Sequence, residues 1–288
     1  MVPDVQPFFH RDSNTWSYVV TEPGGPAAAI IDPVLDFDAR AGRVSTASAE
    51  ALLEHVRERG LDVQWILETH AHADHLSAGD WLRRRLPGAR LAIGDGIRSV
   101  QREFAPVFNL GADFAVDGSQ FDHLWQADEA FTIGALPARV IGVPGHTDDS
   151  CAYLLGDALF TGDSLFMPDS GTARCDFPGG GAATLYRSIR QMYELPDATR
   201  VFVCHDYGVG GSREVACETT IGEQKRHNIH VRADTGEAEF VQLREARDAT
   251  LSMPALMLPA VQVNIRAGAL PEAETNGIRY LKIPLDRF

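Results

Sequence analysis

Four residues whose side chains commonly bind metal ions lie within a run of six. They are His70, His72, Asp74 and His75, in the sequence Thr-His-Ala-His-Ala-Asp-His that begins at residue 69. Zinc, iron and manganese all accept imidazole and carboxylate ligands in proteins. In an extended segment alternate side chains point the same way, so the first three would share one side. Burying such a cluster without a cation would be unfavourable, and we therefore predict a metal site.

Three further candidate ligands occur singly, later in the chain. His146 stands in Pro-Gly-His-Thr, Asp163 in Thr-Gly-Asp-Ser and His205 in Cys-His-Asp-Tyr. Each follows a short apolar run that is typical of a buried strand. Any one of them alone would be a weak indication. If the strand ends meet at one edge of a sheet, the three residues converge on the histidine-rich run and complete the site.

The elements that would position these residues are strands and helices that recur in both halves of the chain. Apolar runs predict strands at residues 17–20, 27–31, 63–68, 90–93, 139–142, 151–155, 158–161 and 200–203. Helical spacing predicts helices at residues 48–59, 76–86, 182–193 and 212–228. This pattern indicates sheets covered by helices in a layered domain.

Three stretches lack a clear period. Residues 36–46 are polar and are predicted to form a loop. Residues 104–125 are rich in aromatic side chains and are predicted to be an inserted loop or helical excursion, with a lid or an oligomer contact as conceivable roles. The tail after residue 252 contains four prolines and is predicted to be an ordered, extended segment.

Composition narrows the class of protein. The 288 residues are 44% hydrophobic and 23% charged, as is usual for a globular protein. A net charge of −14 argues against broad nucleic-acid binding, which needs a basic surface. No apolar run is long enough to cross a membrane, so no membrane partner is expected. The first residues do not resemble a secretory signal and the four cysteines form no CxxC pair, so we expect reduced thiols and a cytoplasmic location.

The order of the motifs resembles the metallo-β-lactamase superfamily. The resemblance rests on His-x-His-x-Asp-His followed by Gly-His-Thr, Gly-Asp and a late Cys-His-Asp, and it covers roughly residues 10–230. It implies an α+β fold in which two mixed β-sheets form a sandwich flanked by helices, the αββα arrangement. We expect a single domain over residues 1–288, with residues 252–288 as a C-terminal extension packed on it.

For the binuclear hydrolases of this family, the resemblance implies two metal sites. One metal would be held by His70, His72 and His146. The second would be held by Asp74, His75 and His205, with Asp163 as the bridging ligand.

Three segments are similar to a narrower branch, the persulfide dioxygenases, also called sulfur dioxygenases. Residues 174–177 resemble their Arg-x-Asp-Phe signature, residues 205–207 their His-Asp-Tyr, and residues 258–268 their C-terminal motif of Pro, Asn, Arg and Gly. In that branch one Fe(II) per chain is held by the residues that match His70, His146 and Asp163, a 2-His-1-carboxylate facial triad. The remaining residues, His72, Asp74, His75 and His205, would then orient ligands or serve as hydrogen-bond partners. The implied reaction, a step of sulfide oxidation, converts glutathione persulfide, O₂ and water to sulfite and glutathione.

The substrate side chains are predicted from charge and from the resemblance. Because glutathione carries two carboxylates, its pocket needs cations and donors, and Arg174 and Tyr207 are candidates. An ion pair with Asp176 is an equally supported role for Arg174. Glutathione-handling relatives suggest Lys225 and Arg226 as well, although a solvated helix face is the simpler interpretation of both.

Cys175 lies between Arg174 and Asp176, close to the expected site. A redox-active or persulfide-accepting thiol is one interpretation of this residue, and a small buried side chain is the simpler one.

Two other functions remain open from the sequence. A binuclear zinc thioester hydrolase of the glyoxalase II type, with two Zn(II) per chain, would use the same seven residues, so ligand counting does not exclude it. A non-catalytic metal-binding or interaction module is disfavoured by the open ligand set. For the assembly we consider a homodimer, and the sequence leaves a tetramer equally open.

Overall fold

The structure is a computed structural model, and it describes residues 1–287. The strands are β1 (Asp4–His10), β2 (Thr15–Thr21), β3 (Ala27–Ile31), β4 (Val34–Asp38), β5 (Arg43–Ser45), β6 (Asp62–Leu67), β7 (Leu76–Ser77), β8 (Arg90–Gly94), β9 (His123–Trp125), β10 (Ala130–Ile133), β11 (Leu136–Gly142), β12 (Cys151–Leu155), β13 (Ala158–Phe160), β14 (Arg200–Phe202) and β15 (Glu218–Thr220). The helices are α1 (Ala47–Glu58), α2 (Gly79–Arg83), α3 (Ile97–Val107), α4 (Ala182–Met192), α5 (Gly208–Gly211), α6 (Ile221–His227), α7 (Glu237–Asp248) and α8 (Met257–Asn264).

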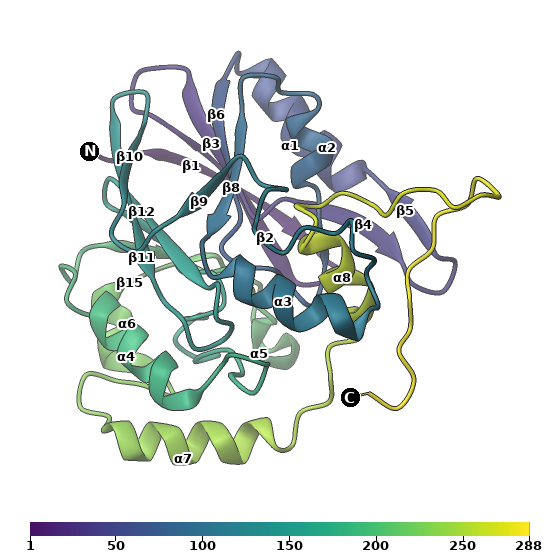
Figure 1. Cartoon of the computed structure of the whole chain (residues 1–288). Coiled ribbons are helices and arrows are strands. Elements are labelled where there is room, and N and C mark those ends of the chain that lie inside the picture. Colours follow the sequence, from purple (N-terminus) through teal and green to yellow (C-terminus); the bar gives the residue numbers. More distant parts are fainter. Residues whose placement is uncertain (288) are drawn as a thin grey trace.

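Two six-stranded sheets form the centre of the molecule. The first has the order β1-β2-β3-β6-β8-β9 and the second the order β10-β11-β12-β13-β14-β15, while β5, β4 and β7 form a small third sheet. Both large sheets are mixed, since β3, β6, β8 and β9 run parallel in the first and β13 pairs parallel with β14 in the second. Helices α1, α2, α3 and α8 lie on the side of the first sheet, and α4, α6 and α7 on the side of the second (Figure 1).

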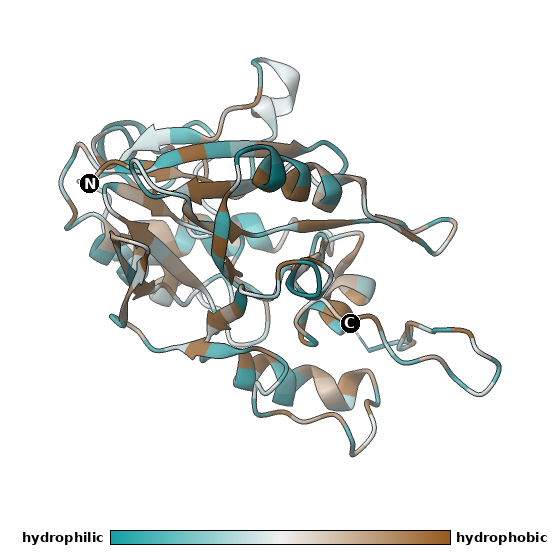
Figure 2. Cartoon of the chain, turned by 90° about the horizontal axis from the view of Figure 1, so that it is seen from above, coloured by the Kyte–Doolittle hydropathy of each residue, from teal (hydrophilic) through white to brown (hydrophobic). Residues whose placement is uncertain are grey.

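Alternating side chains on the strands build the layers. In β2, Val19 packs into the apolar cluster shared with α1, α3 and α8, whereas Val20 packs between the two sheets. A third cluster lies between the second sheet and helices α4, α6 and α7, with Leu159 and Val201 from the sheet side. Hydrophobic residues accordingly follow the strands, while the outer helices carry hydrophilic faces (Figure 2). These four layers confirm the predicted αββα sandwich of mixed sheets.

Three predicted elements are wrong in detail. Residues 36–46 form most of the β4–β5 hairpin rather than a loop, and Asp36 caps the start of α1 through Ser48. The helix predicted at residues 76–86 is reduced to α2, because residues 76–77 pair with β4 as a strand. The helix predicted at residues 212–228 is confined to α6, because residues 218–220 pair with β14 as the edge strand.

The aperiodic stretches also contain regular structure. Helix α3 extends into residues 104–125 and β9 ends them. The tail is not extended throughout, since α8 forms within it and buries Ala260 and Val263 in the first helix layer, whereas most residues after 270 are exposed. Strand β1 and helix α7 were not predicted. Among the described residues, no helix is long and apolar enough to cross a membrane.

Candidate metal centre

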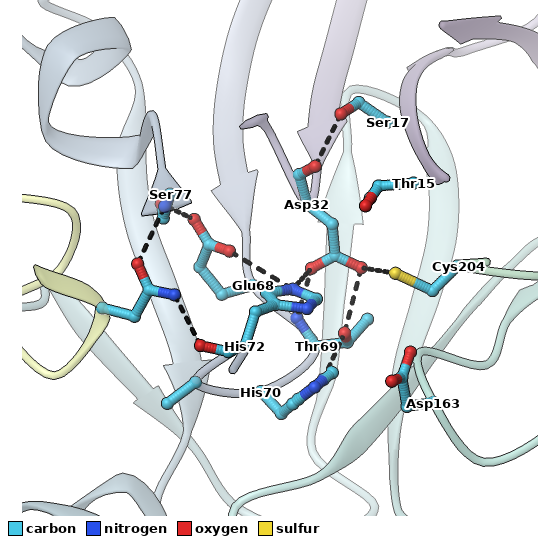
Figure 3. Close-up of polar contacts among 12 residues, drawn as sticks. Thr15, Ser17, Asp32, Glu68, Thr69, His70, His72, Ser77, Asp163 and Cys204 are labelled. Carbon is cyan, nitrogen blue, oxygen red and sulfur yellow. Dashed lines mark hydrogen bonds and ion pairs between the residues drawn. The ribbon is translucent and has the colours of Figure 1, made fainter. Parts of the chain in front are cut away.

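The predicted ligand residues all lie at strand ends on one edge of the sandwich. His70, His72, Asp74 and His75 belong to the loop of residues 69–75, called the histidine loop below, which follows β6. His146 follows β11, Asp163 follows β13 and His205 follows β14. Because β6 is in the first sheet and the other three strands are in the second, the two sheets meet at this cluster (Figure 3).

One group consists of His70, His146 and Asp163. Each offers one ligand atom, and these atoms lie within 4.8 Å of one another. All three residues are buried, and His146 Nε2 is 3.5 Å from Asp163 Oδ2. Two imidazoles and one carboxylate that converge in this way have the composition of a facial triad.

A second group lies directly beside the first. His72, Asp74 and His75 also bring one ligand atom each to within 4.8 Å of one another. His205 joins the two groups, because its Nε2 is 3.2 Å from Asp163 Oδ1 and 3.4 Å from Asp74 Oδ2. The structure therefore brings all seven predicted residues into one cluster, called the metal-type cluster below.

The chemistry of this cluster fits a cation. Six of its buried atoms have no hydrogen-bond partner among the described residues: His70 Nε2, His72 Nδ1, Asp74 Oδ2, His75 Nε2, Asp163 Oδ1 and His205 Nε2. A buried polar atom without a partner is destabilising, and several of them at one place require an explanation. A bound cation satisfies nitrogen lone pairs and carboxylate oxygens together, so the residues present fit one or two metal ions.

The ring nitrogens on the other side of these histidines do have partners. Such contacts fix the tautomer and the ring orientation of a metal-binding histidine. The contacts are His70 Nδ1 with Thr69 Oγ1 (3.1 Å), His72 Nε2 with Asp32 Oδ1 (3.0 Å), His75 Nδ1 with Leu76 O (3.2 Å), His146 Nδ1 with Arg174 O (2.6 Å), and His205 Nδ1 with Asn14 O and Thr15 Oγ1 (both 3.3 Å).

Asp32 is a support that sequence reasoning missed. It follows β3, has a φ of 47° and is buried. Its Oδ1 accepts hydrogen bonds from the Thr69 backbone N–H (2.7 Å) and from His72 Nε2, and its Oδ2 accepts one from the Thr69 hydroxyl (2.9 Å) (Figure 3). The only signal in the sequence was an Asp-Pro pair after an apolar run, which is usually just a strand end.

Asn264 of α8 is a second support. Its Nδ2 donates to His72 O (2.7 Å) and His75 O (2.8 Å), while its Oδ1 accepts from Ser77 N–H (2.8 Å). Gly268, at φ 83°, comes so close to β7 that a Cβ there would lie 2.7 Å from Ser77 O. The sequence identified this motif only by resemblance, and the structure shows that it holds the backbone of the histidine loop.

Burial and neighbouring charges shift the pKa values of the clustered residues in opposite directions. Burial lowers the pKa of His70 well below its usual value, and it lowers the pKa of His75 to about 3. For His72 burial acts in the same direction, but the carboxylate of Asp32 outweighs it and raises the pKa to about 9. Burial and the charge of Asp32 raise the pKa of Glu68, whose Oε2 lies 3.8 Å from His72 Nε2, to about 8. The neighbouring histidines outweigh burial at Asp163 and hold its pKa well below the usual range.

The predicted substrate residue Arg174 is engaged within the protein. Its Nε and Nη2 donate to Asp176 at 2.6 and 2.7 Å, and its Nη1 donates to Ser252 O at 2.7 Å. This is the ion pair that the sequence offered as the alternative role. Cys175 is buried, and burial raises its pKa to about 12, so its protonated thiol contacts Asp248 Oδ2 at 3.3 Å.

The other predicted substrate residues differ in their surroundings. Tyr207 is 51% exposed, and its ring lies 6.3 Å from the ring of His205. On α6, Lys225 pairs with Asp197 at 2.6 Å and Arg226 with Glu223 at 2.7 Å, as a solvated helix face would. Within the described residues, Tyr207 is the one of these three whose side chain lies beside a member of the metal-type cluster.

Known proteins with similar sequences carry three different names. The chain is 53% identical to the "Beta-lactamase hydrolase-like protein" of Agrobacterium fabrum, over 99% of this chain and 65% of that protein. It is 46% identical to "Glyoxylase B2" of Dictyostelium discoideum, over 98% of this chain and 97% of that protein. It is 28% identical to the mitochondrial "Persulfide dioxygenase ETHE1" of Bos taurus, over 90% and 87% of the two chains. The chain thus spans about two thirds of the first relative.

A solved structure and a family model agree with the observed fold. The crystal structure of ETHE1 from Myxococcus xanthus matches with a TM-score of 0.73 and 31% identity, over 93% of this chain and 100% of that chain. The family model described as "Metallo-beta-lactamase superfamily" matches residues 10–205, which include all seven residues of the cluster. The chain therefore belongs to the metallo-β-lactamase superfamily, a family of metal-dependent enzymes.

Proposed function

We propose that this protein is a persulfide dioxygenase with one non-haem Fe(II) per chain. In the proposed reaction, glutathione persulfide, O₂ and water give glutathione, sulfite and two protons. The observation that carries the proposal is the buried convergence of His70, His146 and Asp163 within 4.8 Å. The similarity to ETHE1 from Myxococcus xanthus over nearly the whole chain supports it.

In this proposal His70, His146 and Asp163 would hold the iron. Bound Fe(II) in such a triad supplies open coordination positions at which a substrate sulfur and O₂ can meet. His205 would help to orient the carboxylate ligand, because its Nε2 lies 3.2 Å from Asp163 Oδ1. His72, whose Nε2 is held by Asp32, maintains the ring packing beside His70, with ring centroids 4.0 Å apart.

Aromatic side chains flank the cluster on two sides. Phe177 lies edge-on to His146 at 5.3 Å, and Phe166 lies 6.0 Å from His205 and 6.3 Å from Tyr207. Apolar walls exclude water and favour a soft sulfur group over a hydrated anion. The Tyr207 hydroxyl is available as a donor, and Arg174 would reach a glutathione carboxylate only by exchanging one of its present partners.

A binuclear zinc thioester hydrolase is the second candidate. The observation that favours it is the set of unpartnered atoms on His72, Asp74, His75 and His205, which a second metal would satisfy. Two metal ions held by these residues would supply an activated water for hydrolysis of a thioester. The similarity to Glyoxylase B2 of Dictyostelium discoideum points in the same direction.

One experiment separates the two candidates. Metal content is measured on protein purified without added metal, and O₂ uptake with glutathione persulfide is recorded beside hydrolysis of S-lactoylglutathione. The first proposal predicts about one iron per chain and O₂ uptake with sulfite formation. Two zinc ions per chain with fast thioester hydrolysis and no O₂ uptake would establish the second. O₂ uptake with other persulfides but not with glutathione persulfide would change only the carrier.

The four cysteines bear on location. All four are free thiols, and Cys151, Cys175 and Cys204 are buried. A reducing compartment keeps thiols in this state, so we propose a cytoplasmic enzyme.

A further inference from the structure

A buried ion pair lies outside the metal-type cluster, on α7. Arg244 and Asp248 are 1% and 4% exposed, and Arg244 donates to Asp248 Oδ1 from Nε at 3.1 Å and from Nη2 at 2.7 Å. Removing two charges from water is unfavourable, and a well-packed apolar pair would often be as stable. The pair is therefore a candidate for a role beyond stability.

Both partners of this pair also hold a second segment of the chain. Arg244 Nη1 donates to Thr172 O at 3.0 Å. Asp248 Oδ2 accepts hydrogen bonds from the Cys175 backbone N–H at 3.0 Å and from the Cys175 thiol at 3.3 Å. The ion pair thereby fixes the backbone at residues 172 and 175, on either side of residues 173 and 174.

The residue between these two anchors touches the metal-type cluster. Arg174 O accepts the hydrogen bond of His146 Nδ1 at 2.6 Å, the shortest contact that holds any of the five clustered histidines. The Arg174 side chain is held as well, by Asp176 and by Ser252 O, which lies four residues beyond the end of α7. Phe177 then packs edge-on against His146 at 5.3 Å.

We propose that the Arg244–Asp248 pair is a positioning device for His146. By fixing residues 172 and 175, the pair aims the Arg174 carbonyl at His146 Nδ1, which keeps the proton on Nδ1 and turns the Nε2 lone pair toward Asp163. Helix α7, on the outer side of α4 (Figure 1), thus sets the geometry of a metal ligand that it does not touch. This inference does not depend on whether the protein binds one metal or two, because both candidate functions use His146.

The test removes the ion pair and keeps its volume apolar. The double variant Arg244→Met/Asp248→Leu is prepared in the full-length chain, and Co²⁺ is the probe. We expect the Co²⁺ dissociation constant, measured by chelator competition, to rise about 10- to 100-fold, the range typical when the groups that orient a metal-binding histidine are disturbed. The visible spectrum of the Co²⁺ protein, which reports coordination geometry, should change as well.

Phe240→Leu is the matched control on the same helix. Phe240 is fully buried, and its ring lies 5.8 Å from that of Tyr186 on α4. Its apolar side chain cannot form the hydrogen bonds that hold residues 172 and 175, so its replacement leaves those bonds in place. This variant should lower the melting temperature while leaving the Co²⁺ affinity and spectrum unchanged. A purely structural role of the ion pair predicts instead that both variants lose affinity only in proportion to their loss of melting temperature, and that result would overturn the proposal.

A milder variant keeps the test decisive if the double variant does not fold. Asp248→Asn retains an oxygen acceptor for the Cys175 N–H but loses the charge that pairs with Arg244. We expect a smaller rise in the Co²⁺ dissociation constant, about 3- to 10-fold, with the same direction of spectral change. An unchanged spectrum and affinity in a folded Asp248→Asn protein would also refute the positioning role.

Discussion

The two sheets contribute to the metal-type cluster in different ways. The first sheet supplies four donors from one continuous loop, whereas the second supplies His146, Asp163 and His205 singly, from three strand ends. The histidine loop is braced by a carboxylate, Asp32, and by the amide of Asn264. The second-sheet histidines are braced by neutral carbonyl and hydroxyl groups, with the charged pair of α7 one step further away. The histidine loop is thus held through hydrogen bonds to its backbone as well as to its side chains. The single histidines of the second sheet are held through hydrogen bonds to their rings.

The largest expected difference concerns removal of one ligand from each region. His146→Ala should abolish iron binding, because it removes a member of the proposed triad. His75→Ala should cause at most a partial loss. Metal analysis of both variants after equal purification checks this expectation. Complete loss in both would instead support a binuclear site to which both regions contribute directly.

Asn264→Ala should weaken the histidine loop through its backbone. The change leaves two buried carbonyls and one N–H without a partner, and we expect a loss of about 3 kcal/mol in the free energy of unfolding, with reduced metal affinity. Urea unfolding of the metal-free protein and chelator competition provide the two measurements.

Gln262→Ala is the control for that variant. Gln262 lies on the same helix, is buried, and holds Lys282 through both its amide atoms at 2.8 and 2.9 Å. It should lower stability without altering metal affinity. Equal losses of affinity in the two variants would contradict a specific brace at Asn264.

The charged contact of His72 with Asp32 can be compared directly with the neutral contact of His205 with Thr15. Asp32→Asn should weaken metal binding about 10- to 100-fold, because the amide no longer holds His72 by charge. Thr15→Val, which removes a hydroxyl beside His205, should have a smaller effect because Asn14 O remains as an acceptor at 3.3 Å. Titration with Zn²⁺ against a chelator measures both. A larger effect of Thr15→Val would reverse the comparison.

The smallest expected effect concerns pH. Burial, followed by the charge of Arg244, lowers the pKa of His230 to about 4, and His230 accepts the Thr172 N–H at 3.0 Å. Because the folded state holds this residue neutral, its contribution to the free energy of unfolding is fully present above about pH 6.5 and is lost as the pH falls toward 4. Unfolding of metal-free protein at pH 7.5 and 5 should therefore show about 1 to 2 kcal/mol less pH dependence in His230→Gln than in the unaltered chain. An equal pH dependence of His230→Gln and the unaltered chain would show that the neutral state of His230 does not stabilise the fold on the side of the second sheet.

The same difference between the regions explains what the sequence could predict. The sequence predicts the histidine loop as a metal site because its four candidate ligands lie within six residues. The apolar strands before His146, Asp163 and His205 indicate where these single residues converge. The four-layer fold followed from strand patterns and from the resemblance. Asp32, Asn264, Arg244 and Asp248 were not found as supports, because each acts through a contact between segments far apart in the chain. The β4–β5 hairpin and helix α8 were missed because pairing and burial outweigh their weak local patterns.

The contacts of Asn264 have a consequence for the order in which the protein is made. The carbonyls that this residue holds lie 189 and 192 positions earlier in the chain. During synthesis the histidine loop therefore leaves the ribosome long before its brace exists, and it cannot take its final shape until residue 264 has emerged and α8 has docked. Before α8 docks, the nascent chain would offer metals only loosely arranged histidines, so we expect selective metal binding to follow that docking step.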